Sequence, residues 1–251
     1  MISDVEIAEL VDQLDVHGTA MADAAELAGL AAAVPTCPEW DVRALLAHTG
    51  MVHRWAAGIV RCERDATSNS EFPAPPDGVV DWFREGHGQL VEALRSAPAD
   101  LDTWTFLRAP SPLAFWARRQ AHETAIHRVD AEAAAGSTPT YESAFAMDGI
   151  AELLEGFYAR PRGKLVADPG FTLQAAPDDS DVSWTIQVGP DGRVVTRHDS
   201  NDIVSADCTL RGAASDLYLD LWNRQRTGST RIDGSPEPIA TWRALATVSW
   251  S

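Results

Sequence analysis

The sequence changes character near Gly136, and this change limits the folds that the chain can adopt. Before Gly136, long segments rich in Ala and Leu carry apolar residues at helical spacing, with loops between them. After it, the short runs FTLQA, SWTIQV and RVVTR have the β-rich alternation of strands, and the turn GPDG separates the last two. We therefore predict a two-domain α+β protein, with a helical domain at residues 1–138 and a smaller α+β domain at 139–251.

The first domain is predicted to be a four-helix bundle, because four long helical segments are joined by loops. Gly18 is expected to loosen the first helix, since Gly costs up to ~1 kcal/mol in a helix interior. Thr36 or Cys37 is expected to cap the second helix, with Pro38 in its first turn. Gly136 is expected to end the fourth helix at its C′ position. The four helices are expected at about residues 5–32, 38–61, 78–96 and 112–135.

The second domain is predicted to begin with a helix at about residues 142–158. The three β-rich runs follow, and a fourth strand is expected at ADCTLRG. A short amphipathic helix, AASDLYLDLWNRQ, then leads to a strand at TRIDG and a last helix at PEPIATWRALA. This order of elements indicates an α+β domain of about 110 residues.

Composition excludes several classes of function. The formal net charge of −17 would repel a phosphate backbone, so nucleic acid and anionic membrane surfaces are not expected partners. No run reaches the 18 or more consecutive apolar residues of a membrane span, and the acidic start MISDVEIAELVDQLD is unlike a signal peptide. We expect a cytoplasmic protein.

Its three scattered cysteines are expected to be reduced, with Cys37 as the only candidate nucleophile among them.

Three polar residues that lie far apart in the sequence indicate a metal site. Glu123 and His127 are four residues apart, so on a helix their Cβ atoms lie about 5–6 Å apart and both side chains can reach one point. His48 lies on a mostly apolar helix face and is expected to point into the bundle. Two imidazoles and one carboxylate suit Zn²⁺ or another divalent metal and leave coordination positions open, as catalytic sites do.

The segment HETAIH differs from the zinc-protease motif H-E-x-x-H by one residue. Its two histidines, His122 and His127, are five residues apart and point roughly 140° away from each other around a helix. They cannot both face one metal, and Glu123 is therefore a candidate ligand rather than a general base. His122 and His53 are expected at the surface or rim.

The pattern leaves two alternatives open for the helix that carries Glu123. Arg119, Glu123, His127 and Asp130 could form a buried stripe that a metal compensates. They could also form a solvated face with an Arg119–Glu123 pair worth only ~0.3–0.5 kcal/mol. Asp130 could orient an imidazole from behind, but a surface acid is the favoured interpretation. His48 taken alone is more often a core histidine than a ligand.

Two segments resemble the mycothiol-dependent maleylpyruvate isomerase family, whose N-terminal domain is a DinB-like four-helix bundle. VPTCPEWDVRALLAHTGMVHRW resembles its P-x-W-x-V-x-x-L-x-x-H signature, and RRQAHETAIHRVDAE resembles its H-E-x-x-x-H-R-x-D signature. In the second half, LRGAASDLYLDLWNRQ is similar to the C-terminal domain of the family.

The resemblance implies a divalent metal, usually Zn²⁺, held by His48, Glu123 and His127, with mycothiol as cofactor. It also implies that Arg224, within LWNRQ, is a catalytic-site residue that holds an anionic substrate or a cofactor carboxylate. The resemblance does not imply that maleylpyruvate is the substrate.

Three functions follow as hypotheses. The first is a metal- and mycothiol-dependent isomerase or thiol transferase, with a low-molecular-weight thiol and a small electrophilic metabolite as its partners. The second is a metal-dependent hydrolase, which the lack of an evident general base beside the ligands disfavours. The third is a non-enzymatic stress protein that binds a metal or a thiol. The sequence does not specify an oligomeric state.

Overall fold

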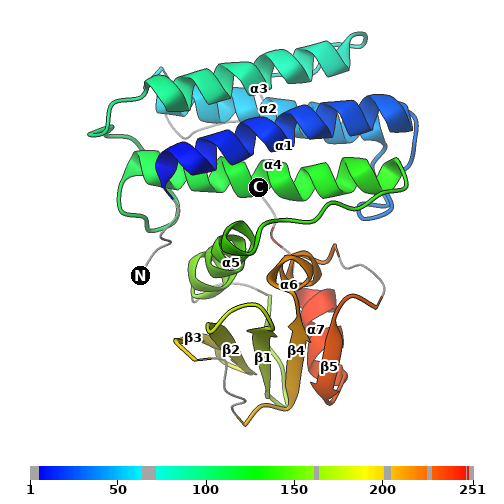
Figure 1. Cartoon of the computed structure of the whole chain (residues 1–251), viewed down its shortest axis with the longest axis vertical. Coiled ribbons are helices and arrows are strands. Elements are labelled where there is room, and N and C mark those ends of the chain that lie inside the picture. The colour runs from blue at the N-terminus through cyan, green and yellow to red at the C-terminus, as the bar shows by residue number, and fades with distance from the viewer. Residues whose placement is uncertain are drawn as a thin grey trace. The chain divides into compact units, whose positions relative to one another are not determined.

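A computed structural model describes residues 6–63, 72–160, 164–200, 205–224, 228–246 and residue 248 (Figure 1). The chain divides into two compact units, Met1–Pro139 and Thr140–Ser251. Long helices make up the described part of the first unit, and the second combines helices with one mixed sheet. The predicted two-domain α+β class is confirmed.

The helical unit consists of long helices that pack side by side, as Figure 1 shows. Helix α1 packs extensively on α4, and α2 packs extensively on α3. The core that joins them is apolar and includes Met21, Leu45, Leu46 and Phe83, all fully buried. The helices are α1 (Ile7–Ala28), α2 (Val42–Val60), α3 (Val79–Ser96) and α4 (Pro112–Ala134).

Helix α1 runs unbroken through Gly18, so the predicted loosening there was wrong. A Cβ atom added to Gly18 would lie 2.3 Å from Cε1 of His87 on α3. The imidazole ring therefore occupies the space that any other side chain at position 18 would need. Packing between α1 and α3 explains the glycine better than local flexibility does.

Helix α2 begins later than predicted, and neither Thr36 nor Cys37 caps it. Asp41 is the N-cap, and its side chain accepts a hydrogen bond of 2.8 Å from the backbone N–H of Ala44. The preceding residues 34–40 form a closed loop instead, since the N–H of Val34 donates to the carbonyl of Trp40. The other helix starts and ends in this unit lie within a few residues of the predicted ones.

The C-terminal unit is built on a sheet with the strand order β3-β2-β1-β4-β5. The pairs β1–β2, β2–β3 and β4–β5 are antiparallel, whereas β1 and β4 are parallel. Leu173 at the centre of β1 lies opposite Ile186 on one side and Cys208 on the other. The strands are β1 (Phe171–Pro177), β2 (Ser183–Gly189), β3 (Gly192–His198), β4 (Cys208–Gly212) and β5 (Arg231–Gly234).

Helices α6 (Ala214–Leu221) and α7 (Glu237–Leu245) both contact β1 and β4. The helix predicted at about residues 142–158 has two parts, because α5 (Ser143–Ala151) continues as a π-helical segment, η1 (Glu152–Tyr158). Within the described residues, no helix combines the length and the apolar character that crossing a bilayer requires.

Candidate metal centre

The residues predicted to bind a metal lie on α4 and α2, and α4 is the most deeply buried helix of the unit. Ser111 caps α4 by accepting a hydrogen bond from the N–H of Ala114, and Pro112 occupies the first turn. Every residue from 119 to 127 is buried, including Glu123 and His127. The alternative of a solvated face is therefore wrong, and these polar groups require partners inside the protein.

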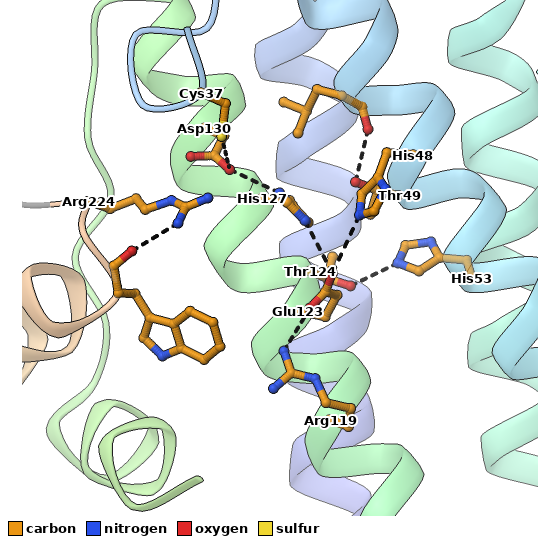
Figure 2. Close-up of polar contacts among 12 residues, drawn as sticks. Cys37, His48, Thr49, His53, Arg119, Glu123, Thr124, His127, Asp130 and Arg224 are labelled. Atoms are coloured by element: carbon orange, nitrogen blue, oxygen red, sulfur yellow. Dashed lines mark hydrogen bonds and ion pairs between the residues drawn. The ribbon is translucent and has the colours of Figure 1, made fainter. Parts of the chain in front are cut away.

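The structure brings His48, Glu123 and His127 together, and Figure 2 shows both imidazoles pointing toward the carboxylate. Each residue offers one ligand atom, and these atoms all lie within 4.8 Å of one another. Oε1 of Glu123 lies 3.2 Å from Nε2 of His127 and 3.8 Å from Nε2 of His48. The side chain of His48 is 22% exposed, so the cluster can be reached from one side.

Glu123 is held as a carboxylate by three neighbours. Nη2 of Arg119, one turn earlier on α4, donates to its Oε2 at 2.8 Å. Burial alone would raise the pKa of Glu123, but the hydrogen bond with His127, the nearby imidazole of His48 and the charge of Arg119 hold the pKa well below its usual range. The site therefore presents an ionised carboxylate, which is the form that binds metals.

His127 is held from both sides of its ring. Nδ1 lies 2.9 Å from Oδ2 of Asp130, and Nε2 faces Glu123. Burial lowers the pKa of His127, but its hydrogen bonds with Asp130 and Glu123 outweigh burial and raise the pKa to about 9. Asp130 is fully buried, so its interpretation as a surface acid was wrong. It holds the imidazole from behind, as carboxylates commonly do beside metal-bound histidines.

The loop before α2 contacts the carboxylate of Asp130. Thr36 donates to Oδ1 of Asp130 at 2.5 Å, and the thiol of Cys37 lies 3.7 Å from Oδ2. Trp40, at the end of the loop, places its ring 4.9 Å from the ring of His48 and 6.0 Å from that of His127, measured between centroids. Asp130 and Trp40 thus fix the loop against both imidazoles, a role that no local sequence pattern indicates.

His53 and His122 lie off the cluster, as their helical positions predict, but neither is at the surface. Both are fully buried. Nε2 of His53 is 2.8 Å from the hydroxyl oxygen of Thr124, so this histidine is part of the core packing beside the cluster. His17 and His87 are buried as well, and no pattern in the sequence indicates their burial.

Arg224 belongs to the C-terminal unit, where it directly follows the turn that ends α6. Its guanidinium donates to the carbonyl oxygen of Trp222 at 2.9 Å, and its backbone N–H donates to that of Leu219 at 2.7 Å. These contacts shape the end of α6, and a role in binding a substrate stays a prediction.

The donor set fits a divalent metal. Two ligands of one tetrahedral metal with bonds of ~2.0–2.2 Å lie roughly 3.4 Å apart, close to the 3.2 and 3.8 Å found around Oε1 of Glu123. Imidazole and carboxylate donors together suit zinc and other first-row divalent ions. In the described part of the chain, this is the group of His, Cys, Asp and Glu side chains that could hold one.

Comparisons with known proteins identify the family of this chain. The family model described as the mycothiol maleylpyruvate isomerase N-terminal domain matches residues 11–132, and the model of the C-terminal domain of the same family matches residues 144–238. Among curated proteins, no sequence matches this chain.

Solved structures agree at the level of the fold. The crystal structure of the mycothiol-dependent maleylpyruvate isomerase matches with a TM-score of 0.59 at 14% identity, covering 93% of this chain and 96% of that one. A histidine-to-alanine mutant of the isomerase matches equally well, with a TM-score of 0.59 at 13% identity and the same coverage. Because the two family models together cover most of the sequence, the chain belongs to the mycothiol maleylpyruvate isomerase family.

Proposed function

We propose that this protein is a metal- and mycothiol-dependent isomerase that acts on a small electrophilic metabolite. Its family is one of isomerases, which makes the chain an enzyme. The observation that carries the proposal is the convergence of His48, Glu123 and His127 inside the domain that the family model matches. Zn²⁺ is the metal that this donor set favours.

His48, Glu123 and His127 would hold the ion, and three protein ligands leave room for a further one. A metal bound there lowers the pKa of a thiol beside it, so that thiolate is available near neutral pH. Thiolate is the nucleophilic form of a thiol, and mycothiol is the thiol that the family name indicates.

The residues around the cluster prepare it for this task. Asp130 accepts the Nδ1–H of His127 and so keeps Nε2 directed toward the cluster, where its lone pair would become available once a metal displaces the Nε2 proton. Trp40 lies against the rings of His48 and His127 and reduces the access of water to them. Each of these contacts fixes the orientation of a ligand before a metal arrives, which reduces the ordering that binding would require.

In an isomerisation, the thiol must add to the substrate and then leave, so that no thiol is consumed. A thiol transferase would instead consume one thiol for each product molecule.

Arg224 is proposed to hold a carboxylate of the substrate or of the thiol, because a guanidinium can bind a carboxylate through two parallel hydrogen bonds. Replacing Arg224 by Met should then raise the KM for an anionic substrate or thiol.

Calorimetry of mycothiol binding tests the proposal. Mycothiol should bind the zinc-loaded protein and not the metal-free protein, and binding should release a proton, which two buffers of different ionisation enthalpy would report. Counting free thiol before and after turnover then separates isomerase from transferase. Equal mycothiol affinity with and without zinc would contradict the proposal, and substrate hydrolysis without thiol would favour a metal-dependent hydrolase.

A further inference from the structure

The two oxygens of the Glu123 carboxylate have different partners. Oε1 faces the imidazoles of His127 and His48, at 3.2 and 3.8 Å. Oε2 accepts a hydrogen bond from Nη2 of Arg119 at 2.8 Å. Figure 2 shows the same division, with Arg119 on one side of the carboxylate and both histidines on the other.

The ion pair between Arg119 and Glu123 is almost completely buried. Their side chains are 1% and 5% exposed. Another Arg–Glu pair with the same spacing on the same helix, Arg128–Glu132, is shorter, at 2.6 Å, but its side chains are 19% and 14% exposed. A buried ion pair is expensive to desolvate and is weak evidence for a role in stability. The orientation of the Glu123 carboxylate therefore explains this buried pair better than a contribution to stability does.

We infer that Arg119 is a positioning residue, which keeps Oε2 of Glu123 occupied and leaves Oε1 as the single oxygen available to a metal. This inference rests on the proposed metal-binding function. A carboxylate that binds through one oxygen uses one coordination position, whereas a carboxylate that binds through both uses two. By restricting Glu123 to one oxygen, Arg119 leaves that second position for a thiol.

The test compares zinc binding by three variants in competition with a chelator. Arg119→Met removes the guanidinium and keeps a long side chain, and its zinc affinity should fall by roughly 10–100-fold, as is typical when a partner of a metal ligand is lost. Arg119→Lys keeps the charge but not the planar fork, so a smaller loss is expected. Arg128→Met is the matched control and should retain the wild-type affinity, because Arg128 contacts Glu132 and His17 instead.

Infrared difference spectra, recorded with and without zinc, report the binding mode directly. The separation between the antisymmetric and symmetric carboxylate stretches is wide for binding through one oxygen and narrow for binding through two. We expect a wide separation in the wild-type protein and a narrow one in Arg119→Met. Glu123→Gln, recorded at a zinc concentration that saturates it, assigns the bands of Glu123, because those bands are then absent while the other zinc-dependent bands remain.

Wild-type affinity and wild-type bands in folded Arg119→Met would overturn the inference, and so would an equal loss of affinity in Arg128→Met. If Arg119→Met does not fold, Arg119→Lys decides, and identity with the wild-type protein in both measurements overturns the inference. A wild-type protein that binds no zinc would instead contradict the proposed function, so the two failures are distinct.

Discussion

At the scale of single residues, the cluster depends on which atom of each side chain faces inward. Glu123 and His127 are one helical turn apart, and both imidazoles face the same carboxylate oxygen. His122, next to Glu123 in the sequence, lies on another side of α4 and takes no part in the cluster. Angular position on the helix therefore separates a candidate ligand from an equally buried histidine.

His127→Ala should lower zinc affinity by at least tenfold, while His122→Ala should leave the affinity of the folded protein unchanged. The reason is geometric, because only His127 places a ring nitrogen beside Oε1 of Glu123. Paired zinc titrations of the two variants measure the difference. Equal losses would mean that His122 contributes to the site, as in the zinc-protease arrangement.

Asp130→Asn should lower zinc affinity by about tenfold, because an amide oxygen supports the Nδ1–H of His127 less well than a carboxylate. Thr36→Val is the matched control. It removes the hydrogen bond to Oδ1 of Asp130 and leaves the contact of Oδ2 with His127 in place. Competition with a chelator measures both affinities. Should Thr36→Val lose as much as Asp130→Asn, the loop rather than the imidazole contact would be responsible.

Burial explains which of these residues the sequence could identify. The spacing of Glu123 and His127 could be interpreted with a single helix, because i and i+4 always share a face. The burial of Asp130, His53 and His122 could not, because it depends on which segments distant in the sequence pack against α2 and α4. A stripe of charged and polar residues along a helix normally faces solvent, and here that expectation fails.

At the scale of the elements, α1 and α3 approach each other closely at a glycine of α1. The ring of His87 on α3 lies against Gly18 of α1. From the sequence alone, the same glycine indicates a weak point in a helix, because its partner lies 69 residues away in the chain. Local propensity therefore predicted where α1 lies but not why it contains a glycine.

Gly18→Ala should destabilise the protein by about 1–3 kcal/mol, although alanine is the better helix former, because the added methyl group would overlap the ring of His87. Gly88→Ala on α3 is the matched control. Gly88 is exposed and has no atom within 4 Å of an added Cβ, so alanine should stabilise the protein by up to ~1 kcal/mol. Urea unfolding measures both changes, and stabilisation by Gly18→Ala would contradict this account of the contact.

The start of α2 shows a second limit of local signals. Thr36 and Pro38 match the usual pattern at a helix start, and so does Asp41. Only the structure shows that Thr36 is engaged with Asp130 on α4, which leaves Asp41 as the cap. A hydroxyl group that could cap a helix is used here for a contact between distant segments.

At the scale of the whole molecule, the order of helices and strands followed from the sequence because each element keeps one pattern over its length. The same sequence did not indicate that the helical unit buries several histidines. Burial lowers the pKa of His17 to about 3, holds that of His53 well below its usual range, and lowers that of His87. Each is therefore a neutral core residue near pH 7.

These histidines should make the metal-free protein sensitive to acid. The unfolded chain binds protons at each of them below about pH 6.5, whereas the folded protein binds these protons only at lower pH, so the free energy of unfolding should fall as the pH drops. The fall is up to ~1.4 kcal/mol per pH unit for each group, and for His17 it continues toward pH 3. His127 acts in the opposite direction, because its folded pKa of about 9 gives stability that is lost as the pH rises from 6.5 through 9.

The metal-free protein should therefore be most stable near pH 7 and less stable on either side, as far as these four groups determine it. Urea unfolding of the metal-free protein at pH 5.5, 6.5 and 8.5 would measure the effect. His17→Gln removes one group that the folded protein cannot protonate, so the loss between pH 6.5 and 5.5 should be smaller by about 1 kcal/mol. An unchanged loss in this variant would show that His17 is protonated in the folded state. A wild-type protein that becomes more stable toward pH 5.5 would contradict the predicted acid sensitivity of the buried histidines as a group.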